Sequence, residues 1–116
     1  MIRKWRIYKA NLDPVIGSEQ GKTRPVLVVS EDAANNLLNV INVLPITSRK
    51  QNRRVYPNEV LLPSGKGGLP DESIVLCYQI RTLDKQRLLT KYGDLEDLTL
   101  QEQVYETICF QLGIDR

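Results

Sequence analysis

The sequence predicts a mainly β domain, a small curved sheet or barrel closed by one helix at its C-terminus. Several short apolar runs are separated by turn residues, which is typical of successive strands. The last segment instead repeats apolar side chains every four positions, which is the period of an amphipathic helix. No repeat, low-complexity tract or linker divides the 116 residues. We therefore expect a single domain over residues 1–116.

The first half of the chain is predicted to contain three strands separated by exposed loops. These strands lie at residues 5–10, 24–30 and 40–46. The signal is strongest at residues 24–30, because the apolar run there is continuous and indicates a strand buried on both faces. Asp13 and Pro14 open a polar loop before this strand, and a single helical turn is expected at residues 31–36 after it. A basic loop is expected at residues 47–54.

The second half is predicted to add three strands and the closing helix. These strands lie at residues 55–62, 73–82 and 88–95, with a flexible glycine-containing loop at residues 64–68. Thr99 and Glu102 have the spacing of a capping box, which marks the start of the helix. Its predicted buried face consists of Leu100, Val104, Ile108 and Leu112. Gly113 is the expected C-cap.

The composition excludes several kinds of chemistry and location. The chain contains no histidine, which excludes serine-type triads, histidine-based ribonuclease chemistry and most catalytic zinc sites. No apolar run approaches the length of a membrane span, and no apolar segment follows the basic N-terminus. Cys77 and Cys109 lie among apolar neighbours and are expected to be buried free thiols. A cytoplasmic protein, not attached to a membrane, is predicted.

The distribution of charge is more informative than the net charge of +2. Residues 1–54 carry ten Lys or Arg and four Asp or Glu, a net charge of +6. Residues 55–116 carry six Lys or Arg and ten Asp or Glu, a net charge of −4. The first half is therefore a candidate cationic surface for a polyanion, with evenly solvated charge as the alternative.

Arg24 and Thr47 are candidate site residues at the ends of predicted strands. Arg24 follows a Gly-, Lys- and Thr-containing loop that is not a P-loop, because it lacks that spacing and precedes a strand. A fixed Arg suits a phosphate or carboxylate, and the alternative is a structural ion pair with Glu19 or another carboxylate. The Thr47 hydroxyl suits a phosphate oxygen, although Thr is also a common strand residue.

Two further groups remain open on local grounds. Residues 48–54 hold four cations, which suits either RNA phosphates or an ordinary solvated loop. Gln79 is expected either to read a base edge or to satisfy backbone groups. Arg81 is expected either to bind phosphate or to pair with Asp84.

Four segments, taken together, resemble the MazF/PemK family of toxin endoribonucleases, most strongly its form in Gram-positive bacteria. They are NLDPVIGSEQG at residues 11–21, RPVLVV at 24–29, ITS at 46–48 and QIRTLDKQRL at 79–88. The resemblance implies an SH3-like barrel of antiparallel strands with a C-terminal helix. It also implies a homodimer whose interface groove binds single-stranded RNA. The implied activity is sequence-specific mRNA cleavage without metal or cofactor, restrained by a small MazE-like antitoxin.

The resemblance also implies roles for individual residues. Arg24 and Thr47 match the catalytic pair of the family. The chemistry leaves two candidates for the general base, Glu19 and a transiently deprotonated Arg24. The implied reaction is attack of the RNA 2′-hydroxyl on phosphorus, giving a 2′,3′-cyclic phosphate and a 5′-hydroxyl, with Arg24 stabilising the developing charge. RNA contacts are expected from Ser18, Gln20, Ser48, Arg49, Gln79 and Arg81.

Some residues depart from the family pattern, and two other functions remain as alternatives. Glu31 stands where close relatives often have Asn, and Tyr78 replaces an acidic residue. These changes leave the catalytic pair intact and the recognised RNA sequence open. One alternative is a toxin of the same fold that binds DNA gyrase, and the other is an inactive RNA-binding relative. The terminal residues 113–116 offer little resemblance to gyrase-binding toxins.

Overall fold

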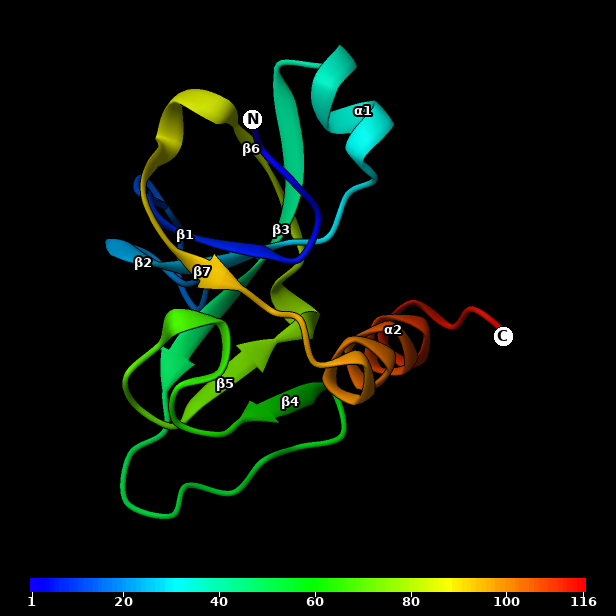
Figure 1. The fold of residues 1–116 in the computed structure, drawn as a ribbon. Coiled ribbons are helices and arrows are strands. Elements are labelled where there is room, and N and C mark those ends of the chain that lie inside the picture. Colours follow the sequence, from blue (N-terminus) through cyan, green and yellow to red (C-terminus); the bar gives the residue numbers. More distant parts are fainter.

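One strongly bent antiparallel sheet forms most of the molecule (Figure 1). The computed structural model describes all residues, 1–116. The strands run in the order β4-β5-β3-β2-β1-β7, and β6 also pairs with β3. The elements are β1 Arg6–Asn11, β2 Thr23–Val28, α1 Asp32–Leu37, β3 Val40–Ser48, β4 Glu59–Leu62, β5 Ser73–Leu76, β6 Arg81–Asp84, β7 Leu88–Asp94 and α2 Leu98–Leu112. The predicted mainly β fold with a C-terminal helix is confirmed.

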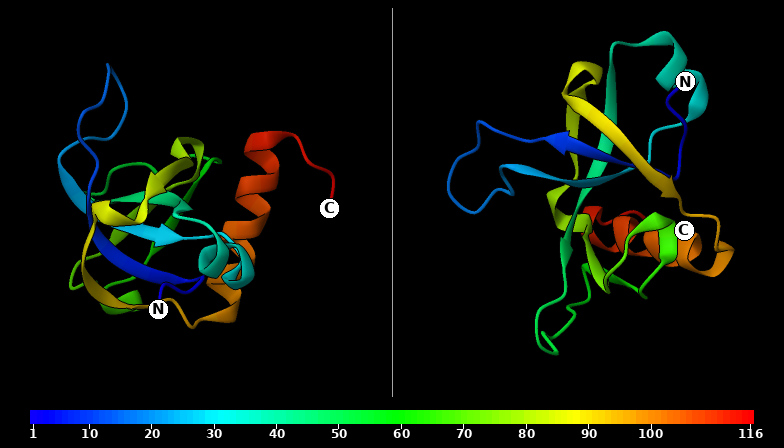
Figure 2. Two further views of the ribbon diagram at one scale, coloured as in Figure 1. Left: turned by 90° about the horizontal axis from the view of Figure 1, so that it is seen from above. Right: turned by 60° about the vertical axis from the view of Figure 1, so that its left-hand side comes forward.

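The core is divided between the two faces of β2. Leu27 belongs to one buried cluster, whereas Val26 and Val28 belong to a second cluster on the other face. Since neighbouring side chains of a strand point to opposite faces, β2 is buried on both, as its continuous apolar run predicted. The first cluster is covered by α2 through Leu100 and Val104, and Figure 2 shows the helix standing against one side of the sheet.

The strand β3 is longer than predicted and pairs with two different strands along the same edge. Its end pairs with β5, where Ile46 lies opposite Val75, and its start pairs with β6, where Val43 lies opposite Arg81. An unbroken β5 ladder would bring Tyr78 opposite Val43, so three extra residues are inserted between the two ladders. They form a 3₁₀ turn, Cys77–Gln79.

The prediction of one strand over residues 73–82 is therefore wrong. The three residues of the 3₁₀ turn have no counterparts on β3. Tyr78 and Gln79 therefore lie outside the strand pairing. The prediction for residues 55–62 is also too long, since only Glu59–Leu62 is a strand. Pro57 has no N–H for a ladder, and the Tyr56 N–H donates to the Glu59 carboxylate instead.

The N-cap of the closing helix lies two residues before the predicted capping residue, Thr99. Asp97 is the N-cap, and its carboxylate accepts a hydrogen bond from the Leu100 N–H at 3.1 Å. The Thr99 and Glu102 capping box is therefore wrong, because the Asp97 carboxylate already occupies the capping position. Gly113 ends the helix at φ 67°, as predicted. The predicted place of Leu112 on the buried face is wrong, because the last turn projects beyond the sheet and leaves this side chain 51% exposed.

The two cysteines are unpaired, as predicted, but differ in burial. Cys77 is fully buried, and burial raises the pKa of its thiol to about 12. Cys109 is only partly buried, because it lies on the projecting end of α2. No helix in the structure combines the length and the apolar character needed to cross a membrane.

Candidate functional site

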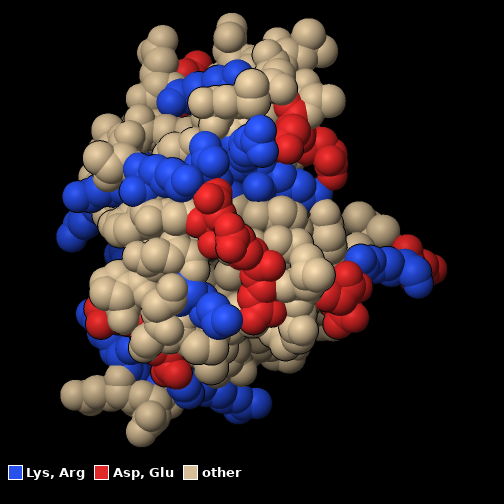
Figure 3. Space-filling view, in the orientation of Figure 1, with Lys and Arg blue, Asp and Glu red and all other residues tan.

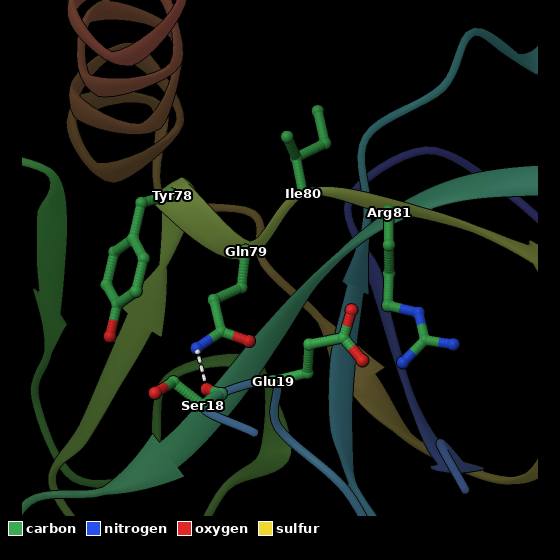
Figure 4. Close-up of a pocket in the computed structure, with 6 residues that line it drawn as sticks. All are labelled: Ser18, Glu19, Tyr78, Gln79, Ile80 and Arg81. Atoms are coloured by element: carbon green, nitrogen blue, oxygen red, sulfur yellow. Dashed lines mark hydrogen bonds between the residues drawn. The ribbon is translucent and has the colours of Figure 1, made fainter. Parts of the chain in front are cut away.

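A pocket of about 460 Å³ lies between the loop after β1 and the 3₁₀ turn Cys77–Gln79 (Figure 4). Its lining residues are Ser18, Glu19, Tyr78, Gln79, Ile80 and Arg81. The fold thus brings together four of the residues predicted to contact RNA or to act in catalysis. Two of these residues come from the β1–β2 loop, and the other two lie about sixty residues further along the chain.

Gln79 holds the β1–β2 loop at two points. Its Nε2 donates to the backbone carbonyl of Ser18 at 3.0 Å, and its Oε1 accepts from the Gln20 N–H at 2.8 Å. Of the two roles considered for Gln79, the structure shows the backbone one. Gln20 itself is partly buried, and its side-chain Oε1 is buried without a hydrogen-bond donor.

The same loop is shaped by its own carboxylates. Glu19 Oε1 accepts a hydrogen bond from the Ile16 N–H at 2.7 Å, and Asp13 Oδ1 accepts one from the Lys22 N–H at 2.8 Å. These bonds close the loop into a fixed arc and turn the Glu19 side chain to the pocket (Figure 4). Glu19 therefore has an ordered position, although glutamate is common in solvated loops.

Arg81 adds a cation to this pocket from the start of β6. Its Nη1 donates to the Leu12 carbonyl at 3.3 Å. The alternative in which Arg81 pairs with Asp84 is wrong, because the Asp84 carboxylate accepts from the Gln86 N–H in the following turn. Figure 4 shows Arg81 at one side of the pocket and Tyr78 at the other.

Arg24 and Thr47 lie on the neighbouring strands β2 and β3. Val26 pairs with Pro45 at the end of the β2–β3 ladder, and Arg24 and Thr47 each lie two residues beyond this last pair. Arg24 Nε donates to the Gly21 carbonyl at 3.1 Å, and no carboxylate forms an ion pair with this Arg. The structural ion pair considered for Arg24 is therefore absent, and its guanidinium retains donors for a ligand.

Thr47 and Ser48 open onto a smaller pocket, separate from the first. This pocket has a volume of about 250 Å³ and is also lined by Pro25 and Tyr92. Both residues belong to β3 rather than to the basic loop in which they were predicted. Neither Arg24 nor Thr47 lines the 460 Å³ pocket, so the predicted site residues form two neighbouring groups rather than one.

Two of the four cations in the basic loop hold the fold. Arg49 pairs with Glu72 at 3.0 Å and donates to the Arg53 carbonyl. Arg53 forms a two-point ion pair with the buried Glu59 at 2.9 and 2.8 Å. The hydrogen bonds from Arg53 hold the pKa of the Glu59 carboxyl below its usual range.

Lys50 and Arg54 are the cations of this loop that make no ion pair. The solvated-loop interpretation therefore fails for Arg49 and Arg53, and only Lys50 and Arg54 are without a carboxylate partner. On the face shown in Figure 3, positive and negative residues lie side by side rather than on separate surfaces. No three Cys, Asp or Glu side chains are grouped so that they could hold a metal ion.

Tyr78 and Ile80 line the pocket and were not among the predicted site residues. Tyr78 was visible in the sequence only as a departure from a family pattern. Its position depends on the three-residue insertion opposite β3, which becomes apparent only from the pairing of strands far apart in the chain.

Comparisons with known proteins agree along nearly the whole chain. Residues 3–112 match the family described as PemK-like, MazF-like toxin of type II toxin-antitoxin system. The chain is 36% identical over 114 residues to Endoribonuclease EndoA of Bacillus subtilis (strain 168), covering 98% of this chain and 97% of that protein.

Solved structures show the same fold. The crystal structure of MazF (Form-I) from Deinococcus radiodurans matches with a TM-score of 0.81 at 29% identity, covering 97% of this chain and 96% of that chain. An endoribonuclease in complex with its cognate antitoxin from a Mycobacterial species matches with a TM-score of 0.80 at 20% identity, covering 100% and 99%. The sequence and the fold thus point to the same group of proteins.

Proposed function

Because the chain belongs to the PemK/MazF family of type II toxin–antitoxin toxins and is an endoribonuclease, we propose that it cuts single-stranded mRNA without a metal ion. The 2′-hydroxyl of the RNA attacks the adjacent phosphorus and forms a new O–P bond. The bond from phosphorus to the 5′-oxygen breaks, and that oxygen receives a proton. The products are a 2′,3′-cyclic phosphate and a free 5′-hydroxyl.

The observation that carries this proposal is the guanidinium of Arg24, which has no carboxylate partner and lies, like Thr47, two residues beyond the last β2–β3 pair, on the neighbouring strand. A guanidinium held at a strand end without a competing carboxylate is suited to a phosphorane oxyanion, since it is charged at every physiological pH. Its contribution is of the kind given by preorganised donors, about 10²–10³-fold in rate for a single donor. The Thr47 hydroxyl holds a non-bridging oxygen.

The proton of the 2′-hydroxyl needs an acceptor, and Arg24 is a poor one because a guanidinium has donors but no acceptor. Glu19 is the carboxylate that we assign to this role, because it lines the 460 Å³ pocket and is exposed. One of its oxygens binds the Ile16 N–H, and the other is left for a proton. The substrate backbone then extends from the Arg24–Thr47 group to the pocket beside Gln79.

The residues that we propose to serve RNA binding, directly or by shaping the site, are Ser18, Gln20, Ser48, Arg49, Gln79 and Arg81. In this assignment Gln79 acts by fixing the β1–β2 loop, and Arg49 by fixing the basic loop, because both side chains already bind protein groups. Ser48 and Arg81 contact phosphates. We further propose a homodimer with the RNA groove at its interface, an antitoxin of the MazE type that covers this groove, and a cytoplasmic location where mRNA is available.

The test is incubation of the purified chain with single-stranded RNA in EDTA. The expected result is a set of discrete cuts that carry 2′,3′-cyclic phosphate and 5′-hydroxyl ends. Arg24→Ala and Thr47→Val should each lower the cleavage rate about 10²-fold or more while the fold is retained, and Thr47→Ser should restore most of it. Gyrase inhibition without RNA cleavage would overturn the proposal, and RNA binding without cleavage would identify an inactive relative.

A further inference from the structure

A second pocket adjoins the first across the ring of Tyr78. It has a volume of about 470 Å³, and Tyr78 lines both. Its other lining residues are Arg53, Tyr56, Pro57, Asn58, Glu59 and Phe110. Figure 4 shows the Tyr78 ring at the edge of the first pocket, on the side away from Arg81. A ligand strand that leaves the first pocket past Tyr78 therefore enters the second.

Exposed aromatic side chains gather around this second pocket. Tyr56 is 49% exposed, Tyr78 39% and Phe110 65%. They come from three separate segments: the loop before β4, the 3₁₀ turn and the end of α2. The chain has only seven aromatic residues, so three of them meet at one open pocket. Such a surface is costly to leave in water and indicates a flat, apolar ligand.

The charges beside these rings favour an anionic ligand. The Arg54 guanidinium lies 5.3 Å from the Tyr56 ring centre and makes no ion pair. The Arg53 guanidinium lies 5.9 Å from the same ring and neutralises Glu59, the one carboxylate of the pocket. A net positive charge therefore accompanies the aromatic faces. Flat rings with an adjoining cation are the combination that binds an unpaired base and its phosphate.

We propose that the second pocket is a nucleotide subsite in which a base of the bound RNA, next to the bases in the first pocket, stacks on Tyr78. Tyr56 and Phe110 line the remaining walls, and Arg54 contacts the phosphate. The occupant is a nucleotide of the same strand, because the two pockets share Tyr78 and a cation stands at each, Arg81 in the first and Arg54 beside the second. This proposal rests on the proposed function.

The test uses an RNA in which the nucleotide at the cut carries a 2′-deoxyribose, so that binding is measured without cleavage. The fluorescent base 2-aminopurine is placed at each position in turn, and the position quenched by the wild type but not by Tyr78→Ala marks the subsite. Tyr78→Ala should weaken binding roughly 5- to 100-fold, the effect of losing one stacked base, and Tyr78→Phe should retain it. Phe110→Ala should weaken binding, whereas Leu112→Ala on the same exposed helix end should not.

An RNA without a base at the marked position gives the decisive comparison. The wild type should bind it as weakly as Tyr78→Ala binds the intact RNA, and Tyr78→Ala should lose nothing further. If the wild type cuts RNA but Tyr78→Ala and Phe110→Ala bind it normally, the subsite is overturned and the proposed function stands. If these variants change only the affinity for an antitoxin peptide, the pocket is a peptide site. A wild type that neither binds nor cuts RNA overturns both proposals.

Discussion

The Gln20 N–H donates to Gln79 Oε1 at 2.8 Å, although the two residues are 59 positions apart. With the bond from Gln79 Nε2 to the Ser18 carbonyl, it fastens the β1–β2 loop to the 3₁₀ turn. This pair sets the shape of the 460 Å³ pocket. The position of Glu19, between the two anchored residues, depends on it.

Replacing Gln79 should therefore reduce activity more than stability. Gln79→Ala removes two hydrogen bonds of about 1 kcal/mol each, at a partly exposed site. We expect RNA cleavage to fall about ten-fold or more and the Gln20 amide hydrogen to exchange faster. Gln86→Ala, at an exposed residue of the next turn, is the control and should change neither. Unaltered Gln20 exchange in Gln79→Ala would show that the loop does not depend on this side chain.

Glu19→Gln separates the structural role of Glu19 from a role as general base. The amide oxygen of Gln still accepts from the Ile16 N–H, so the loop should keep its shape while the proton acceptor is lost. The rate of RNA cleavage should fall, and its rise with pH on the acidic side should disappear. Glu19→Ala should in addition loosen the loop. A pH–rate profile of Glu19→Gln that matches the wild type would remove Glu19 from the reaction.

The cations without ion pairs in the basic loop should control the salt dependence of RNA binding. Lys50→Ala and Arg54→Ala should each reduce the slope of log affinity against log salt by about 0.7, the value for one phosphate contact of a single strand. Arg49→Ala should instead lower the stability of the protein, because Arg49 binds Glu72 and the Arg53 carbonyl. Binding titrations at several salt concentrations provide the slopes. Equal slopes for wild type and both variants would show that RNA phosphates do not contact Lys50 or Arg54.

The ion pair between Arg53 and Glu59 should make the stability depend on pH. The hydrogen bonds from Arg53 lower the pKa of the folded Glu59 carboxyl, so its contribution is present above the unfolded pKa and is lost as pH falls through the folded pKa. At pH 7, Glu59→Gln should lower the free energy of unfolding by roughly 1.5–3 kcal/mol, the scale of a charged hydrogen bond.

Urea unfolding at neutral and at strongly acidic pH measures this effect. The difference between the wild type and Glu59→Gln should shrink toward zero in acid, where the wild-type carboxyl is protonated as well. Glu106→Gln, at an exposed residue without an ion pair, is the control and should show little difference at either pH. If the free energies of unfolding of wild type and Glu59→Gln differ by the same amount at both pH values, the loss of stability comes from the shape of the side chain and not from its charge.

Local sequence patterns predicted the elements whose buried side chains lie close together in the chain. The run at β2 and the four-residue period of α2 follow from side chains close together in the chain, so both elements lay near their predicted places. The break between β5 and β6 could not be predicted in this way. It follows from the register of β3 with two partners, and no local signal at Cys77–Gln79 reports a pairing partner more than thirty residues away.

The candidate site shows the same division. Arg24 and Thr47 were singled out by residue type and by resemblance, and the β2–β3 register then explains why they lie on neighbouring strands. The roles of Arg49 and Arg53 could not be predicted, because their carboxylate partners lie elsewhere in the sequence. Gln79 was predicted near the site, but its backbone partners in the β1–β2 loop required the folded chain.

The burial of β2 on both faces also limits how proteins with this fold can diverge. A substitution at Val26, Leu27 or Val28 disturbs the core before it reaches any ligand, so these positions offer little variation that selection could use. Strand ends, the β1–β2 loop and the 3₁₀ turn lie outside that constraint. Changes in the RNA sequence that such a toxin prefers should therefore accumulate in these short segments, while the centre of the sheet is inherited almost intact.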